Sequence, residues 1–306
     1  MASVVVIGGN GFLGSAIVDE LAAAGHEVTA FDRFTSGRPV YTAEGVRQIR
    51  GDVLEPIDVR RALEGQQYVF HFVSSSTPAT AEASPTLDLR TNIPATVSLL
   101  AAAADMGVER VFYASSGGAI YGDQALDAFS EDVVPEPLSP YAIGKLAIEG
   151  YLRFFWRTRG LPSVSLRISN PYGPRQRTSR GQGVVASFLR SAARGEPVTV
   201  YGGGSMVRDY IYADDVARMV CSTVGTLAQH RIYNIGSGTG TSVAEIVDLV
   251  GEVTGVPLKV ERAERPRTFV ERSVLDVSRF TDEFGVAAGV GLREGMERTW
   301  AAIAGE

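Results

Sequence analysis

Cysteine and histidine are scarce in this 306-residue chain, which has one cysteine and three histidines. The lone Cys221 excludes an intramolecular disulfide and fits a reducing cytoplasm. We expect its side chain to be a small, buried apolar group, and we expect no metal site.

An excess of basic residues is also missing. The net charge is −6, so the sequence carries no basic footprint of a nucleic-acid partner. No apolar run reaches the roughly 18 to 20 residues that span a bilayer, and the N-terminus lacks the charged segment of a signal peptide. The sequence therefore predicts a cytoplasmic globular protein with no nucleic-acid and no membrane partner.

The N-terminal segment has the pattern of a βαβ unit. A β-branched run without alternation, as in a strand covered on both faces, precedes a glycine turn, a helical pattern and a second strand. We expect these elements over residues 4–7, 12–24 and 27–31, with Asp32 after the second strand. Strand, glycine turn, helix, strand and acid in this order are typical of a dinucleotide-binding unit.

Strands and helices keep alternating up to residue 168, which predicts an α/β fold with a doubly wound parallel (Rossmann) sheet. Further strands are expected at 46–50, 68–73, 110–114 and 163–168, and helices at 57–63, 87–106 (irregular near Pro94) and 139–159. Later elements are shorter and separated by a long loop, with helices expected at 184–195, 214–229 and 242–254. We expect a Rossmann domain over 1–168, to which 209–240 return, and a smaller interleaved α/β domain over 169–306.

The three glycines of the first turn have a physical purpose. Gly8, Gly11 and Gly14 allow a tight turn and let backbone N–H groups approach a pyrophosphate at a helix N-terminus. Asp32 would accept hydrogen bonds from ribose hydroxyls and repel a 2′-phosphate, which favours NAD over NADP. Arg33 works against that preference, since a guanidinium pairs with phosphate. A glycine-rich turn with no ligand is the plainer alternative.

Tyr141 and Lys145 lie four residues apart in the helix expected over 139–159. That spacing puts both side chains on one helix face. A phenol acts as a base at neutral pH only when something stabilises its phenolate, and a neighbouring ammonium does so. The same spacing is common on ordinary amphipathic helices, so its meaning depends on the other motifs.

Those motifs cover nearly the whole chain. They are Gly8-x-x-Gly11-x-x-Gly14, Asp32, Gly51-Asp52-Val53, Ser115-Ser116-Gly117-Gly118-Ala119-Ile120-Tyr121-Gly122, Tyr141-x-x-x-Lys145, and the segments 170–176, 201–212 and 233–238. Together they resemble the extended short-chain dehydrogenase/reductases. Within that superfamily the chain is similar to the NAD-dependent nucleotide-sugar epimerases of the UDP-glucose 4-epimerase type. The resemblance implies NAD as cofactor, a UDP-sugar as substrate, and inversion of the sugar at C4 through a 4-keto intermediate.

The resemblance also implies roles for three residues at the reacting centre. Tyr141 would be the base and acid, and Lys145 would stabilise its phenolate and bind the nicotinamide ribose. Ser116 would donate a hydrogen bond to the reacting sugar hydroxyl. Because Ser115 is adjacent and two glycines follow, giving this role to Ser116 assumes a one-residue bulge, with the Ser115 hydroxyl satisfied by the backbone.

Further binding residues follow from the same resemblance. Those expected at the cofactor are Gly8, Gly11, Phe12, Leu13, Gly14, Asp32, Asp52, Val53, Val73, Asn92, Tyr141 and Lys145. Those expected at the substrate are Ser116, Asn170, Tyr201, Arg208, Arg265, Arg175 and Arg272. For Asp52 a turn-forming role, for Asn92 a helix cap and for Arg265 a surface charge are the plainer alternatives.

Several alternatives stay open at this level. A nucleotide-sugar 4-reductase, dehydratase or decarboxylase shares the Tyr/Lys pair, although a 4,6-dehydratase would carry Asp-Glu where this chain has Gly117-Gly118. A non-catalytic NAD-binding sensor usually lacks that pair. Arginines in segments that line the sugar end in relatives could meet the carboxylate of a uronic acid sugar, or they could be solvated; they are Arg175, Arg177, Arg180 and Arg272.

The expected helix over 139–159 carries more apolar surface than one face of a sheet needs. Its second half contains Tyr151, Leu152, Phe154, Phe155 and Trp156. Relatives dimerise through this helix and the one near residues 92–105. We therefore expect a homodimer, with simple core packing as the alternative.

Overall fold

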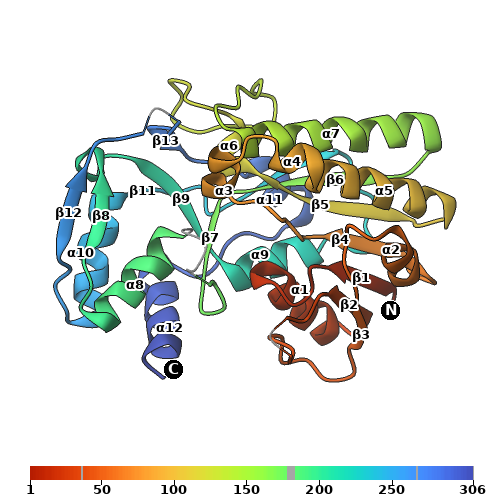
Figure 1. Ribbon diagram of the computed structural model, residues 1–306, viewed down its shortest axis with the longest axis horizontal. Coiled ribbons are helices and arrows are strands. Elements are labelled where there is room, and N and C mark those ends of the chain that lie inside the picture. Colours follow the sequence, from red (N-terminus) through yellow and green to blue (C-terminus); the bar gives the residue numbers. More distant parts are fainter. Residues whose placement is uncertain (36, 178–182, 267, 306) are drawn as a thin grey trace.

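The computed structural model describes residues 1–35, 37–177, 183–266 and 268–305. Its larger part is a seven-stranded sheet in which all neighbouring strands are parallel. In spatial order the strands are β10 (Ile232–Ile235), β6 (Ser163–Ile168), β5 (Arg110–Ser116), β4 (Tyr68–His71), β1 (Ser3–Ile7), β2 (Glu27–Asp32) and β3 (Arg47–Arg50). The expected doubly wound parallel sheet is confirmed (Figure 1).

The strand order reverses between β1 and β4. From β1 the chain builds β2 and β3 on one side, and from β4 it builds β5, β6 and β10 on the other. Beyond the carboxyl ends of the two central strands, the turn at Gly8 and the backbone of Val73 approach each other. Ligands of open parallel sheets bind in the crevice at this reversal.

Helices cover both faces of the sheet. One face carries α2 (Pro56–Leu63), α5 (Asn92–Asp105) and α7 (Pro140–Arg159), and the other carries α1 (Phe12–Ala23), α9 (Ala213–Cys221) and α11 (Ser278–Phe284). Figure 1 shows α5 and α7 above the sheet and α1 and α9 below it. The central strand shows why β-branched residues occupy it: Val4 and Val6 enter one core, Val5 and Ile7 the other, and all four are fully buried.

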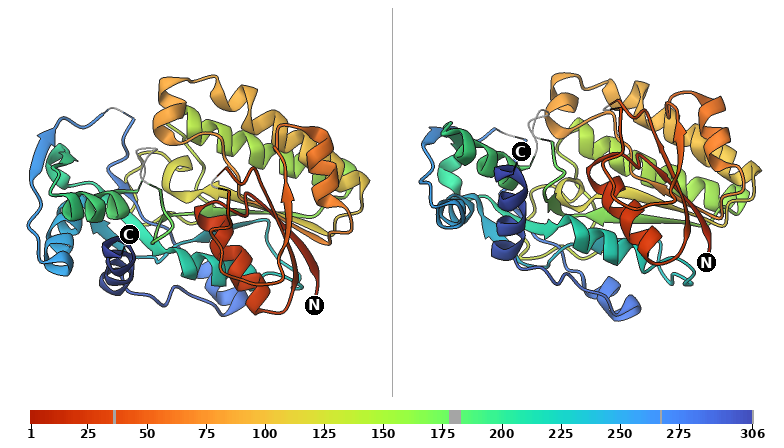
Figure 2. Two further views of the ribbon diagram at one scale, coloured as in Figure 1. Left: turned by 60° about the horizontal axis from the view of Figure 1, so that its bottom comes forward. Right: turned by 90° about the horizontal axis from the view of Figure 1, so that it is seen from below.

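The smaller part has two short sheets and its own core, seen at the left of Figure 1 and in both views of Figure 2. One sheet joins β11 (Gly240–Ser242), β9 (Val207–Tyr212), β13 (Arg272–Ser273) and β7 (Asn170–Tyr172), and the other joins β8 (Val198–Tyr201) and β12 (Val260–Ala263). The helices here are α8 (Val184–Arg194), α10 (Val243–Thr254) and α12 (Leu292–Ala304). Within 209–240, β9 belongs to this part and β10 to the large sheet, and the domain boundaries given above stay a prediction.

Two expected helices differ from the structure. The segment 87–106 is not one helix but α4 (Leu87–Arg90) and α5, separated at Thr91, whose φ of −126° and ψ of −79° are not helical. Pro94 lacks the N–H that would bond the carbonyl of Arg90, so the break lies just before it. A short helix, α3 (Pro78–Ala83), had no counterpart among the expected elements.

The helix expected over 214–229 ends at Cys221. The hydroxyl groups of Ser222, Thr223 and Thr226 donate to backbone carbonyls three residues earlier, which offers the backbone an alternative to a helix. Gly225 then has a φ of +76°. Among the helices of the described residues, none has the length and apolar character that a bilayer crossing requires.

Candidate active site

A cleft of about 820 Å³ lies between the large sheet and the smaller part. The expected site residues that line it are Gly8, Gly11, Phe12, Leu13, Asp32, Asp52, Val53, Val73, Ser116, Tyr141, Lys145, Asn170, Arg175 and Arg208. The structure thus brings together residues from the glycine turn, four strand ends and the start of α7. The expected residues that do not line the cleft are Gly14, Asn92, Tyr201, Arg265 and Arg272.

The glycine turn is shaped for close approach. Gly8 has a φ of +90°, which favours glycine, and its amide donates to Phe31 at 2.8 Å. A Cβ on Gly14 would lie 2.0 Å from the Gly8 carbonyl oxygen, so glycine here packs α1 against the turn. Helix α1 begins after Gly11 with no side-chain cap and no acid in its first turn. Its N-terminus therefore fits a dinucleotide pyrophosphate.

Two carboxylates stand at the far end of this turn. Asp32 is held by the amides of Asn10 and Phe34, each 3.2 Å from one of its oxygens. Asp52 accepts from Leu54, and Arg33 turns toward it, with 4.0 Å between Nη1 and Oδ2. The negative charges of Asp32 and Asp52 favour ribose hydroxyls over a 2′-phosphate. The Arg33 guanidinium, which could otherwise pair with such a phosphate, lies near Asp52 instead.

Helix α7 presents Tyr141 and Lys145 to the cleft. Its N-terminus is fixed by Ser139, which accepts from the Ala142 amide, and by Pro140 at the first helical position. Lys145 is 8% exposed, and its Nζ donates to the Ala114 carbonyl at 2.8 Å. The ammonium nitrogen lies 5.6 Å from the Tyr141 ring centroid and 4.9 Å from that of Tyr113. The helix spacing therefore does put both groups on one buried face.

Burial shifts both groups toward their neutral forms. It raises the pKa of Tyr141 to about 12, helped by the charge of Asp88 and opposed by a hydrogen bond with Ser116. It lowers the pKa of Lys145 to about 8, against the opposing effects of Asp88 and Glu149. At neutral pH the lysine is still charged and the phenol protonated. Tyr141 therefore needs added positive charge beside it before it can accept a proton.

The structure separates the roles of the two adjacent serines. Ser115 is buried and donates to a Glu149 oxygen at 2.6 Å, so a side chain satisfies it and not the backbone. Ser116 lies at the cleft, close enough to Tyr141 to act against the rise in the pKa of that phenol. The β5–β6 register stays regular through Ser116, and the role of Ser116, with its assumed bulge in the loop, stays a prediction. A Cβ at Gly117 would lie 2.5 Å from Leu275, so that position accepts no side chain.

On the opposite wall, Arg208 and Asn170 reach the cleft from β9 and β7. The Arg208 guanidinium donates to the carbonyls of Val270 at 2.6 Å and Val207 at 2.8 Å, and burial lowers its pKa. Asn170 donates to the Asp209 carbonyl at 3.2 Å. Tyr201 does not line the cleft itself. Its ring packs behind that of Phe269, which does, with 5.4 Å between the two ring centroids.

Most of the other arginines expected at the substrate are engaged elsewhere. Arg175 pairs with Asp19 of α1 at 2.6 Å, on the cofactor side of the cleft. Arg272 donates a hydrogen bond to the Asp127 backbone carbonyl at 2.8 Å, and Arg265 forms an ion pair with Glu271.

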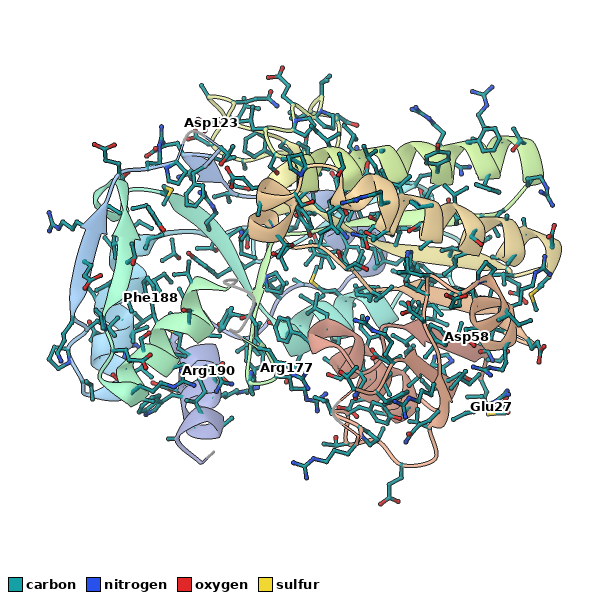
Figure 3. All side chains as sticks on the ribbon, viewed as in Figure 1. Glu27, Asp58, Asp123, Arg177, Phe188 and Arg190 are labelled. Carbon is teal, nitrogen blue, oxygen red and sulfur yellow. The ribbon has the colours of Figure 1, made fainter. Side chains whose placement is uncertain are left out.

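Two more arginines belong to the loop after β7. Arg177, labelled in Figure 3, is exposed on the rim of the cleft. Arg180 lies outside the described residues.

Asn92 belongs to a buried network behind the cleft. It donates to Ser76 at 2.9 Å, accepts from the Ser75 amide at 2.8 Å, and contacts Asp88. Asp88 was not expected from the sequence, nor was the buried ion pair of Glu149 and Arg167 at 2.8 Å. The signal for both was present: each is a charged residue inside a segment predicted to be helix or strand with an apolar face.

Comparison with known proteins agrees with this geometry. Residues 4–236 match the NAD dependent epimerase/dehydratase family. The chain belongs to that family. It is 32% identical over 301 residues to the UDP-glucose 4-epimerase of Mycolicibacterium smegmatis, covering 96% of each chain.

Two solved structures are closely similar. The UDP-glucose 4-epimerase of Thermus thermophilus in complex with NAD has a TM-score of 0.92 and 36% identity over 99% of each chain. The UDP-glucose 4-epimerase of Thermotoga maritima with UDP-glucose has a TM-score of 0.92 and 34% identity over 98% of each chain. The family, the NAD cofactor and the enzyme class expected from the sequence are confirmed.

Proposed function

We propose that this protein inverts C4 of a UDP-hexose, with Tyr141 as the group that takes and returns the proton of the O4 hydroxyl. The observation that carries the proposal is the meeting of Tyr141, Lys145 and Ser116 on one cleft whose far end is shaped for a dinucleotide. An NAD-dependent UDP-sugar 4-epimerase needs these parts: a base beside a hydride carrier, and a donor for the reacting oxygen.

The residues of the chain divide this work. Bound NAD supplies a hydride acceptor and donor at C4. Lys145 contributes positive charge beside the Tyr141 phenol, so that Tyr141 ionises more readily than its burial alone allows. Ser116 donates to the sugar oxygen while the 4-keto sugar turns over in the cleft. Tyr141 would then return the proton to O4, and because bound NAD would take up and give back the same hydride, the reaction would have no net redox change.

Arg208 and Asn170 are placed to hold the diphosphate on the opposite wall. A planar guanidinium suits two phosphate oxygens, and its present partners are backbone carbonyls that a phosphate can replace. Arg272 is held by the Asp127 carbonyl, whereas Arg175 pairs with Asp19 through Nη2 and has a buried Nη1 without a partner at the cleft. The UDP-glucose 4-epimerases among the relatives support a neutral hexose ahead of a uronic acid.

The alternatives differ in what they do to the sugar. A dehydratase, reductase or decarboxylase uses the same Tyr/Lys pair, and a binding sensor would use none of it. Incubation of the enzyme with UDP-glucose, UDP-glucuronate and UDP-N-acetylglucosamine, with products resolved by NMR, separates them. We expect UDP-galactose from UDP-glucose and the slowest inversion with the uronate. No C4 inversion of any of the three would exclude epimerase activity.

We also propose a homodimer through α7 and α5. On α7, four large apolar side chains are 39% to 54% exposed, namely Ile143, Tyr151, Phe154 and Trp156. Light scattering at micromolar concentration should give a dimer mass, and Phe154→Glu should shift it toward the monomer. A monomer mass for the unchanged protein would remove the proposal. The cytoplasmic location rests on the single, buried Cys221 and stays a prediction.

A further inference from the structure

A second, much smaller cavity lies beside Lys145, lined by residues of α7, α4, α5, β4 and β5. Its volume is about 10 Å³, close to the least that admits one water molecule. Three polar atoms of its lining residues are buried without a partner: His71 Nδ1, Asp88 Oδ2 and the Tyr113 hydroxyl. Lys145 also lines it, and only one of its Nζ protons is used, by Ala114.

The hydrogen bonds of His71 settle which of these atoms accept. The Thr96 hydroxyl donates to the Asn92 carbonyl at 2.7 Å, so it must accept from His71 Nε2, 2.8 Å away. His71 is neutral, because burial and then the charge of Lys145 lower its pKa to about 3. The Nδ1 atom of this tautomer is therefore an acceptor.

The cavity thus holds two acceptors and two donors. Asp88 Oδ2, as a carboxylate oxygen, and His71 Nδ1 accept, and Asp88 Oδ1 is already satisfied by Ser76 at 2.8 Å and by Asn92. The Tyr113 hydroxyl and the Lys145 ammonium can donate. One water has two protons and two lone pairs, so it matches all four at once.

Helix packing brings Asp88 to this position. A Cβ on Gly144 would lie 3.0 Å from the Asp88 side chain, so glycine beside Lys145 allows α4 and α7 to approach. The charged and titratable groups facing Lys145 are His71 from β4, Asp88 from α4, Tyr113 from β5, and Tyr141 and Glu149 from α7 itself. Glu149 is paired with Arg167 of β6, whereas Asp88 has no cationic partner among the described residues.

We propose that this cavity binds one water that bridges Asp88, His71, Tyr113 and Lys145, and that Asp88 is a positioning residue for the Tyr141–Lys145 pair. The inference rests on the roles proposed above for that pair. The Asp88 carboxylate stabilises the Lys145 ammonium through the water and opposes ionisation of the Tyr141 phenol. Asp88 does not line the cleft, and it acts through Lys145.

The test is the pH dependence of kcat in Asp88→Asn. Activity needs the Tyr141 phenolate and the Lys145 ammonium, and loss of the Asp88 charge lowers the pKa of both groups. The whole profile should therefore move toward acid by about one pH unit. Asp215→Asn is the matched control, because Asp215 is 1% exposed, is ion-paired with Arg218 in α9, and does not line the cleft. Tyr113→Phe removes a water ligand but no charge, and its profile should stay in place.

An unmoved profile in Asp88→Asn, or an equal shift in Asp215→Asn, would overturn the inference. A crystal structure of the NAD-bound wild-type protein tests the water even if Asp88→Asn does not fold. Density within hydrogen-bond distance of Asp88 Oδ2 and Tyr113 is expected, and an empty cavity contradicts the proposal. Failure of the proposed function shows differently, as a wild-type protein without epimerase activity.

Discussion

Glu149→Gln is the substitution that tests the buried polar core most sharply. The Glu149 carboxylate accepts three bonds, from Ser115 Oγ at 2.6 Å, Arg167 Nε at 3.1 Å and Arg167 Nη2 at 2.8 Å. The two ion-paired side chains are 6% and 3% exposed, and Arg167 also donates to Tyr121 at 3.0 Å. Burial acts to lower the pKa of Arg167, but Glu149 outweighs it and the pKa is raised. The guanidinium thus stays charged.

Glutamine keeps the shape of Glu149, and its amide oxygen can still accept from Ser115 Oγ and Arg167 Nε. Its NH₂ group, however, would face the N–H of Arg167 Nη2. The variant leaves a buried guanidinium without its counter-charge, which costs about 3 to 5 kcal/mol. Urea unfolding followed by circular dichroism measures the loss in free energy of unfolding. Asp105→Asn is the matched control: its carboxylate also bonds two arginines, Arg60 at 3.0 Å and Arg159 at 2.7 Å, but at the surface. Equal losses in the two variants would refute the reasoning, because they would mean that water reaches the Glu149 pair.

Two further outcomes follow from the site. Gly14→Ala should abolish NAD binding in calorimetry, because its Cβ would lie 2.0 Å from the Gly8 carbonyl oxygen, whereas Gly150→Ala, with open space around it, should bind normally. Lys145 should also make the NAD-free protein more stable as the pH rises. Burial lowers its pKa from 10.5 to about 8, so the unfolded chain holds the proton more tightly between these values. The free energy of unfolding should therefore rise from about pH 8 to about pH 10.5, and Lys145→Met should lack that rise; an identical rise in Lys145→Met contradicts the assignment.

The sequence predicted those parts of the fold whose causes are local. The βαβ unit could be predicted because Gly8, Gly11 and Gly14 form a tight turn in which a Cβ atom would clash or be strained, and because β1 is buried on both faces. The Tyr141–Lys145 face was readable because helix spacing fixes it. The position of the helix break at Thr91 was predicted only approximately. Pro94 disfavours a regular helical turn before it, but this does not determine which residue leaves the helical conformation.

Other parts depend on contacts between distant segments, and a local signal could not say which partners these residues meet. Asp88 becomes important only because α4 and α7 meet at Gly144, far along the chain from it. Arg175 carried the right chemistry for a sugar carboxylate, but the fold gives it Asp19 as partner. The partner of Ser115 also lies far along the chain, since its hydroxyl donates to Glu149 of α7.

The most direct test of the central claim is the turnover of Tyr141→Phe with UDP-glucose, measured by NMR of the sugar beside NAD binding measured by calorimetry. Loss of the phenolic oxygen removes the proton acceptor and leaves the glycine turn, Asp32 and Lys145 in place. Inversion at C4 should fall by about 100- to 10,000-fold while NAD still binds. Wild-type turnover in Tyr141→Phe would contradict the account.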